Sequence, residues 1–201
     1  MDIAKLIERV RGIVLSPKTE WEKIAAEPAD VKSLFTGYAM ILAAIPAVCG
    51  LIGSTVIGMS LPIVGTFRTP IAAALVQMVL TYVLGLVIIY VVALIVDALA
   101  PTFDGSKNAI QALKLVVYSS TPVWLAGVFA LIPVLSALGI LAALYGLYLL
   151  YIGLAPMMKN PQDKSIGYTA LIIVCYIVLA IIVGAVIASV VGTGIAMRGH
   201  F

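Results

Sequence analysis

Residues 97–124, DALAPTFDGSKNAIQALKLVVYSSTPVW, decide the fold of this chain. The second half of the stretch is apolar enough for a membrane span, yet it contains the polar cluster YSSTP at residues 118–122. Water does not reach backbone groups inside a bilayer, so a proline with hydroxyl neighbours at that depth has to face protein rather than acyl chains. We therefore expect other helices to enclose this span. The stretch also holds four of the few charged side chains beyond residue 33: Asp97, Asp104, Lys107 and Lys114.

The composition is that of a membrane protein. Hydrophobic residues make up 63% of the 201 residues and charged residues 10%, and the mean hydropathy is +1.20. A soluble domain carries about 25% charged residues, and a helix needs about 20 apolar residues to cross a hydrocarbon core. The predicted fold class is therefore all-α, a polytopic membrane protein with five transmembrane helices. We expect the spans at residues 34–59, 70–98, 107–133, 135–158 and 165–197.

A short amphipathic helical segment is expected before the first span. Apolar and charged side chains alternate at helical spacing over residues 2–15, which is too short to span and is predicted to lie at the membrane surface or under the bundle. Ser16-Pro17 predicts the start of a second short helix. The alternative is a solvated charged helix pair. We expect no cleaved signal peptide, since no apolar h-region follows a basic start.

These patterns divide the chain into a cytoplasmic amphipathic segment, residues 1–33, and a five-helix transmembrane domain, residues 34–201. Basic residues set the orientation. With the N-terminus in the cytoplasm, ten of the twelve basic residues and all nine acidic residues lie on the cytoplasmic side, and only Arg68 and Arg198 lie opposite. The C-terminus is then outside, and the cytoplasmic face is the one that could carry chemistry.

One polar stripe follows the third span at helical spacing: Lys107, Gln111, Lys114, Tyr118 and Thr121. Ser106 is the expected N-cap of that helix. Pro122 removes a backbone donor and frees a carbonyl that the hydroxyls of Ser119 or Thr121 could occupy. Two interpretations stay open, a structural kink lined by its own hydroxyls and a polar crevice open to the cytoplasm.

Small residues recur along three spans and predict close helix packing. Gly50, Ser54 and Gly58 are spaced by four in the first span, and Gly139, Gly146 and Gly153 by seven in the fourth. Ala180, Gly184, Ala188 and Gly192 are spaced by four in the fifth. The simplest interpretation is a tight bundle within one chain, and the alternative is an interface between two copies.

The absent chemistry argues against an enzyme. His200 is the single histidine and lies one residue from the end, so a histidine metal site and a Ser-His pair are not expected. We also expect no cofactor and no nucleic acid partner. No charged residue lies at the predicted centre of a span, which disfavours an ion-coupled transporter but not a passive pore.

Two short motifs and two longer stretches resemble the Yip family, the Ypt/Rab-interacting multi-pass membrane proteins. Residues 97–101, DALAP, resemble the family's Asp-Leu-x-Gly-Pro motif, with Ala98 in place of Leu and Ala100 in place of Gly. Gly167-Tyr168, followed by an aliphatic residue at Ile172, resembles its second motif. The stretches ALKLVVYSSTPVWLAG and YGLYLLYIGLAPMMKNPQDKSIGY are similar to the bacterial branch, as is LSPKTEWEKIAAE near the N-terminus.

The resemblance implies five spans, a cytoplasmic N-terminus, an outside C-terminus and a plasma (inner) membrane. We expect a non-enzymatic scaffold that binds protein or lipid partners through its cytoplasmic face. The alternative is a small-solute channel or carrier that uses the crevice of the third helix. The partners would be the lipid bilayer and either a second copy or another membrane protein. The candidate binding residues are Asp97, Pro101, Lys107, Lys114, Tyr118, Ser119, Thr121, Pro122, Lys164, Gly167 and Tyr168.

Overall fold

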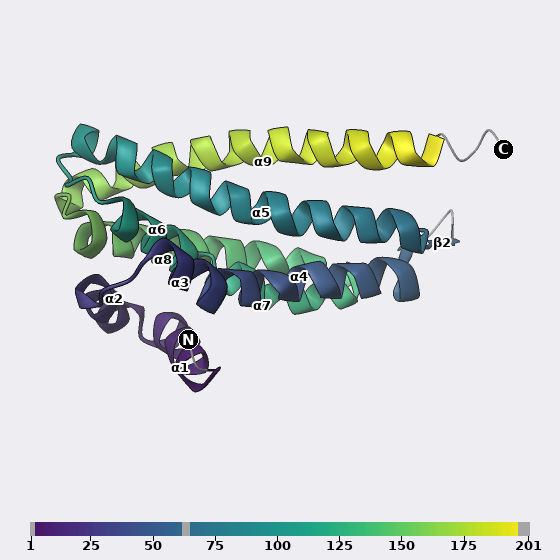
Figure 1. Ribbon diagram of the computed structural model, residues 1–201, viewed down its shortest axis with the longest axis horizontal. Coiled ribbons are helices and arrows are strands. Elements are labelled where there is room, and N and C mark those ends of the chain that lie inside the picture. Colours follow the sequence, from purple (N-terminus) through teal and green to yellow (C-terminus); the bar gives the residue numbers. More distant parts are fainter. Residues whose placement is uncertain (1–2, 62–64, 197–201) are drawn as a thin grey trace.

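The computed structural model describes residues 3–61 and 65–196, and it is a bundle of long apolar helices lying side by side (Figure 1). Five stretches are long and apolar enough to cross a membrane: Val31–Ile57, Ile71–Phe103, Ala109–Leu131, Gly139–Met158 and Gln162–Val190. They correspond one to one with the predicted spans. The all-α fold with five transmembrane helices after a short N-terminal helical segment is therefore confirmed.

The first span is built from four consecutive helical pieces: α3 (Val31–Leu34), the π-helical turn η1 (Phe35–Ala39), α4 (Met40–Ile52) and a second π-helical turn, η2 (Gly53–Ile57). Asp30 caps its start, because its carboxylate accepts the Ser33 backbone N–H at 2.9 Å and its own N–H donates to the Ser33 hydroxyl. The Ser33 side chain makes the largest contribution to lowering the pKa of the Asp30 carboxyl, and the Ser33 backbone N–H makes the next largest. The sequence did not predict the short hairpin that follows, in which β1 (Met59–Leu61) pairs antiparallel with β2 (Gly65–Phe67).

The remaining spans follow in an up-and-down order (Figure 1). Their elements are α5 (Ile71–Leu99), η3 (Ala100–Phe103), α6 (Ala109–Ser119), α7 (Thr121–Ala126), η4 (Gly127–Leu131), η5 (Pro133–Leu138), α8 (Gly139–Met158), η6 (Gln162–Lys164) and α9 (Ser165–Ala196). The third span is thus interrupted at Ser120, where α6 ends and α7 begins with Pro122 in its first turn. This break is the kink expected from the proline. The N-cap of α6 is Asn108, whose Oδ1 accepts the Gln111 backbone N–H at 3.1 Å, so the prediction of Ser106 was wrong.

The two N-terminal helices, α1 (Ile3–Leu15) and α2 (Pro17–Ala26), pack against the bundle near one of its ends (Figure 1). Ile13, Trp21 and Ile24 are at most 1% exposed and join the bundle's core. The Tyr145 hydroxyl of α8 donates to the Val14 carbonyl at 2.6 Å. The helix pair therefore packs under the bundle, and the alternative of a solvated pair is wrong.

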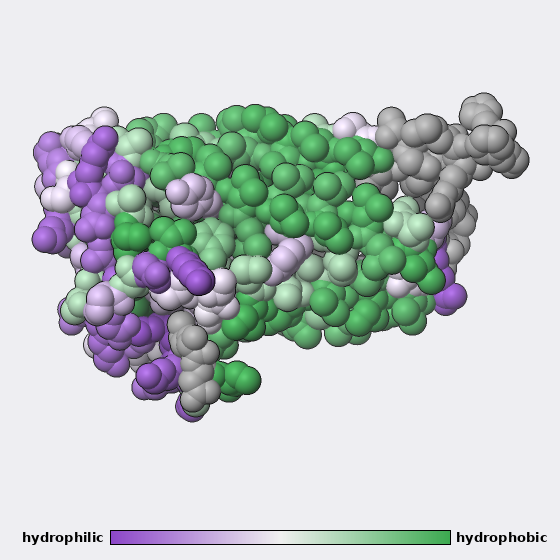
Figure 2. All heavy atoms as spheres, viewed as in Figure 1, coloured by the Kyte–Doolittle hydropathy of each residue, from purple (hydrophilic) through white to green (hydrophobic). Residues whose placement is uncertain are grey.

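Charge is concentrated at this same end. Figure 2 shows most of the hydrophilic residues of that view beside α1, α2 and the α5–α6 and α8–α9 connections, with an apolar surface along the rest of the bundle. The four ion pairs of the described residues also lie here. The predicted gathering of charge on one side is confirmed.

Only part of the predicted small-residue packing is found. A Cβ on Gly146 would lie 2.9 Å from the Ser119 carbonyl oxygen, and one on Gly153 would lie 2.6 Å from Trp21, so these two glycines admit close neighbours. In the first span it is Gly53, not Gly50, that meets another helix, at the Ala130 carbonyl. Gly184 has open space around it, and Ala180 and Ala188 are exposed, so these three members of the stripe on the fifth span do not pack within this chain; the surroundings of the fourth, Gly192, lie outside the described part.

Candidate functional site

The polar stripe of the third span is covered by the N-terminal helix pair. The Gln111 side-chain amide donates to the Ala25 carbonyl at 2.8 Å. The Lys114 ammonium donates to the Ile24 carbonyl at 2.8 Å and to the Glu27 carbonyl at 2.5 Å. A cation at the C-terminal carbonyls of a helix satisfies orphan acceptors and meets the negative end of the helix dipole. These bonds fasten the end of α2 to α6, across 86 to 90 residues of sequence.

An aromatic cluster fills the space behind Lys114. The Tyr118 ring meets Tyr38 edge-on with 4.8 Å between ring centroids and Trp21 at 6.4 Å. The Arg9 guanidinium lies over the same ring, 5.7 Å from its centroid, within the range of a cation–π contact. One turn deeper, the Tyr38 hydroxyl and the Thr121 hydroxyl form a buried hydrogen bond of 2.8 Å.

The inner part of the stripe is enclosed by protein, while its members Lys114 and Tyr118 line a cleft. Tyr118, Ser119, Thr121 and Pro122 are all buried. The hydroxyl that turns back onto the helix is that of Ser120, which donates to the Val116 carbonyl at 2.8 Å, rather than that of Ser119 or Thr121. The Ser119 hydroxyl is buried without a hydrogen-bond partner. The helix break at Pro122 is observed, and α1 and α2 cover the stripe except at the cleft lined by Lys114 and Tyr118.

A cleft remains on the outer side of this cluster. It has a volume of about 540 Å³ and is lined by Arg9, Glu20, Glu27 and Lys114, with Lys5 of α1 and Ser33 at the start of the first span. Arg9 forms ion pairs with both Glu20 and Glu27, and Lys23 pairs with Glu20 at 3.3 Å. Burial alone would lower the pKa of the Arg9 guanidinium, but the hydrogen bond to Glu27 and the nearby acidic groups outweigh it and raise that pKa.

A second cluster joins the two short motifs at the start of α9 and the end of α5. The Tyr168 hydroxyl donates to the Val96 carbonyl. The Tyr168 ring stacks on Phe103 with 4.7 Å between centroids and 8° between planes. Gly167 lies against the same phenylalanine, since a Cβ there would lie 3.3 Å from it. Val96 and Phe103 flank residues 97–101, so this contact brings the two motifs side by side.

The connection beside this contact is also fixed. Lys164 forms an ion pair with Asp104, and the Ser106 backbone N–H donates to the Met158 carbonyl at 2.7 Å. Gly105 sits where a Cβ would lie 3.0 Å from that same carbonyl. Asp104 adopts a left-handed conformation with φ of 55°. The loop between α5 and α6 is therefore held against the end of α8.

We call the exposed side chains around this contact the motif face: Pro101, Thr102, Lys107 and Ile166. All four are exposed, and Ile166 is 67% exposed although it is large and apolar. Tyr168 is fully buried, and Ala100, in the place of the motif glycine, is buried too. Asp97 is partly buried, and its Oδ1 has no hydrogen-bond partner. Tyr168, Ala100 and Asp97 therefore lie beneath the motif face, and the exposed side chains on it are mainly those of their neighbours.

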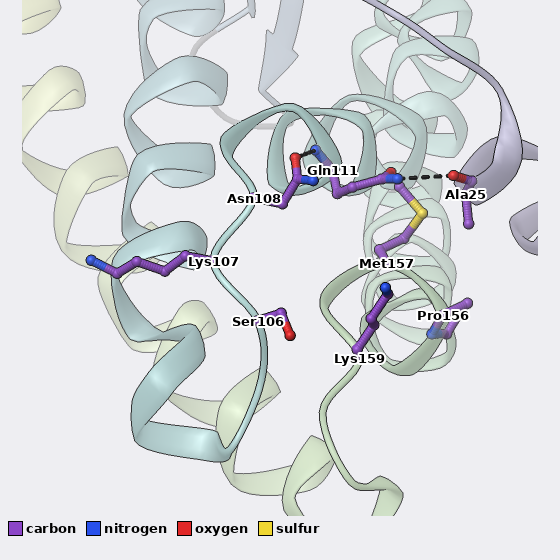
Figure 3. A pocket seen from close by; sticks show the side chains of 8 residues that line it. All are labelled: Ala25, Ser106, Lys107, Asn108, Gln111, Pro156, Met157 and Lys159. Carbon is purple, nitrogen blue, oxygen red and sulfur yellow. Dashed lines mark hydrogen bonds between the residues drawn. The ribbon is translucent and has the colours of Figure 1, made fainter.

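A smaller cavity of about 370 Å³ lies between α2, the start of α6 and the end of α8 (Figure 3). Figure 3 shows the Gln111 side chain bonded to Ala25 across it, while the Lys107 side chain points away. Both Lys107 and Gln111 line this cavity. The exposed Lys107 side chain points away from it and is assigned to the motif face, whereas Gln111 and Lys114 bond to α2.

Sequence reasoning missed several residues of both clusters. Arg9, Glu20 and Trp21 were seen only as parts of an amphipathic segment, and Tyr38 and Phe103 were not singled out. The one available signal was the density of charge in the first 33 residues. Within residues 3–61 and 65–196, no group of three His, Cys, Asp or Glu side chains could hold a metal ion.

The model of the Yip1 domain matches residues 11–195. The chain belongs to the Yip1 family. It is similar to the inner membrane protein YohC of Escherichia coli K12, with 24% identity over 167 residues that cover 82% of this chain and 86% of YohC. YohC of E. coli O6:H1 matches to the same extent. No solved structure matches the chain significantly. Family membership and the five apolar helices make it a multi-pass membrane protein.

Proposed function

We propose that this Yip1-family protein is a non-enzymatic membrane scaffold that binds a protein partner through its motif face. The observation that carries the proposal is the packing of two distant motifs into one ordered surface. Tyr168 and Phe103 are locked by stacking and by the bond to Val96, so the exposed groups above them are held in place. A preorganised surface loses less freedom on binding.

The exposed groups of the motif face suit a protein partner. Pro101 and Ile166 offer apolar contact, and Lys107 offers a charge at the edge. Interfaces combine an apolar centre with a polar rim in this way.

The proposal includes an orientation. The end that carries the N-terminal helices and most of the charge is placed in the cytoplasm, because short loops rich in Lys and Arg stay on that side. We propose that the protein resides in the plasma (inner) membrane, because the similar protein YohC is named an inner membrane protein.

Site-directed photo-crosslinking in native membranes tests the proposal. A photoreactive residue at Thr102 or Ile166 should give a discrete crosslinked band, and one at the exposed Arg68 on the opposite connection should not. Lys107→Glu should lower the yield about fivefold, since an exposed charge contributes about 1 kcal/mol. Lys32→Glu, an exposed lysine away from the motif face, is the matched control. Equal crosslinking from Arg68, or none from Thr102 and Ile166, contradicts the proposal.

A small-solute channel or carrier stays the alternative function. The Tyr38–Thr121 pair and the unpartnered Ser119 hydroxyl continue the polar stripe below Tyr118. Passage along it would require α1 and α2 to leave their present position. Flux into liposomes above that of empty liposomes, reduced by Thr121→Val together with Tyr118→Phe, would support this alternative, and no flux across a broad solute panel would remove it.

A further inference from the structure

The cleft beside the N-terminal helices is lined by four basic and three acidic side chains, a formal excess of one positive charge. Lys5 and Glu8, three residues apart on α1, form no ion pair among the described residues. Glu20 is shared by Arg9 and Lys23, and Glu27 pairs with Arg9. Lys114, by contrast, forms no ion pair in the part of the chain that the structure describes, although its side chain lines the cleft. Lys114 is only 3% exposed.

Backbone carbonyls compensate this ammonium only in part. It has three N–H donors, of which the carbonyls of Ile24 and Glu27 take two. The end of a helix supplies about half of one negative charge, so a positive charge remains beside the cleft. A buried ion without a full counter-charge is unfavourable, and an anion in the cleft would supply the missing charge and accept the third proton.

The position of the cleft indicates where such an anion comes from. Ser33 and Leu34 line it at the point where the first span begins, so it lies at the depth where the chain passes from water into the membrane. On α1, Ile3 is 74% exposed and Ile7 is 53% exposed, four residues apart on the same side of the helix. Such a helix lies with its apolar side in the boundary between headgroups and acyl chains.

We infer that the cleft between α1, α2 and α6 is a binding site for the phosphate of an anionic phospholipid headgroup, with Lys114 as its counter-ion. The volume of about 540 Å³ falls within the usual range of ligand sites, about 300–1,000 Å³. The exposed Lys5 lines the cleft together with the exposed Glu8, and the apolar side chains of α1 lie beside the acyl chains of the same lipid. The inference does not rest on the partner proposed for the motif face.

The test uses the full chain in nanodiscs that contain equal parts of phosphatidylcholine and phosphatidylglycerol. Native mass spectrometry of the ejected protein counts the lipids that remain bound. We expect one retained phosphatidylglycerol on the wild type and a loss of about 10- to 100-fold in its affinity in Lys114→Met, since a hydrogen bond to a charged group contributes about 1.5–3 kcal/mol. Lys114→Arg should keep the lipid because it keeps the charge.

Lys32→Met is the matched control. Lys32 is exposed next to the start of the first span but does not line the cleft, so its loss should leave the retained lipid unchanged. An equal loss in Lys32→Met would show general attraction to the basic surface and would overturn the site.

The lipid retained by the wild-type protein tests the inference even if Lys114→Met fails to fold. Equal retention of phosphatidylcholine and phosphatidylglycerol overturns the inference. Inorganic phosphate added to protein in pure phosphatidylcholine is the second arm. If it binds, and phosphatidylglycerol then has no advantage over phosphatidylcholine, the site takes free phosphate and the lipid assignment is wrong. Unchanged phosphatidylglycerol binding in a folded Lys114→Met also contradicts it.

Discussion

The third and fifth spans differ more than any other two helices of the bundle. The most apolar window of the third has a mean hydropathy of 1.3 and is 61% buried in protein, while that of the fifth has 3.2 and is 6% buried. In water the most apolar helix would be the buried one, but in lipid an apolar surface gains little by leaving the acyl chains. The least apolar span therefore lies inside the bundle, where Lys114, Ser120 and Thr121 find hydrogen-bond partners.

The two spans are also held in different ways. The third meets the first span, α8 and both N-terminal helices through hydrogen bonds, rings and close glycine contacts. The fifth is most deeply buried near its start, at Tyr168, Thr169 and Ile172. Its later turns are largely exposed, although Leu179 and Val183 pack against the core. Substitutions should therefore affect stability strongly around the third span and weakly along the later fifth.

The largest effect is expected at the contact between the first and third spans. A Cβ on Gly53 would overlap the Ala130 carbonyl oxygen, a backbone atom that cannot rotate away. Gly53→Ala should lower the free energy of unfolding by about 3 kcal/mol, the upper end for overpacking. Gly50→Ala is the control on the same span, because a Cβ there meets nothing within 4 Å. Unfolding in detergent followed by circular dichroism measures both, and equal effects would place the wrong glycine at the contact.

A smaller effect is expected where Lys114 holds α2. Lys114→Met leaves the Ile24 and Glu27 carbonyls without their donor and should cost about 2 kcal/mol. The N-terminal helices should loosen, so Trp21 emission shifts to the red in a Trp124→Phe background that isolates this tryptophan. Lys32→Met should leave the emission unchanged. A wild-type spectrum in Lys114→Met would show that the helix pair is held by other contacts.

The buried hydroxyl pair should contribute less. Thr121→Val removes the partner of the Tyr38 hydroxyl and should cost about 1 kcal/mol. A double-mutant cycle with Tyr38→Phe isolates the coupling, because the second substitution should cost little once the first is present. Fully additive effects would mean that the 2.8 Å contact does not contribute to stability.

The smallest effect is expected on the fifth span. Gly184→Ala adds a methyl group in open space and should change the free energy of unfolding by less than about 0.5 kcal/mol. The same unfolding assay measures it. A destabilisation as large as that of Gly53→Ala would mean that this stripe packs against another helix, as a second copy of the chain would provide.

The spans and the gathering of charge were predictable because both depend on the order of residue types along the sequence and not on contacts between distant residues. Hydropathy over about 20 residues locates a membrane helix without knowledge of its neighbours. The opposite holds for the partners of Lys114, which lie 87 and 90 residues away in backbone carbonyls that every sequence contains. Nothing in the residue types distinguishes those carbonyls from any others.

The glycine spacing predicted for the first span was wrong for a geometric reason. The spacing of four that linked Gly50 to Ser54 and Gly58 assumes a regular α-helix, but after Gly50 α4 passes into the π-helical turn η2 at Gly53. A π-helical turn has more residues per turn and rotates the later side chains to another face. The two short motifs can be read from the sequence, but only the fold shows that Phe103, outside both, stacks on Tyr168 of the second one.

The most direct test of the account compares the lipid exposure of the third and fifth spans in the unaltered protein. A lipid-soluble carbene reagent, photolysed in liposomes, labels side chains that face acyl chains, and mass spectrometry locates the labels. We predict dense labelling over residues 174–190 and almost none over residues 112–119, whose side chains are buried. Labelling of residues 112–119 as dense as that of residues 174–190 would contradict the enclosed third span.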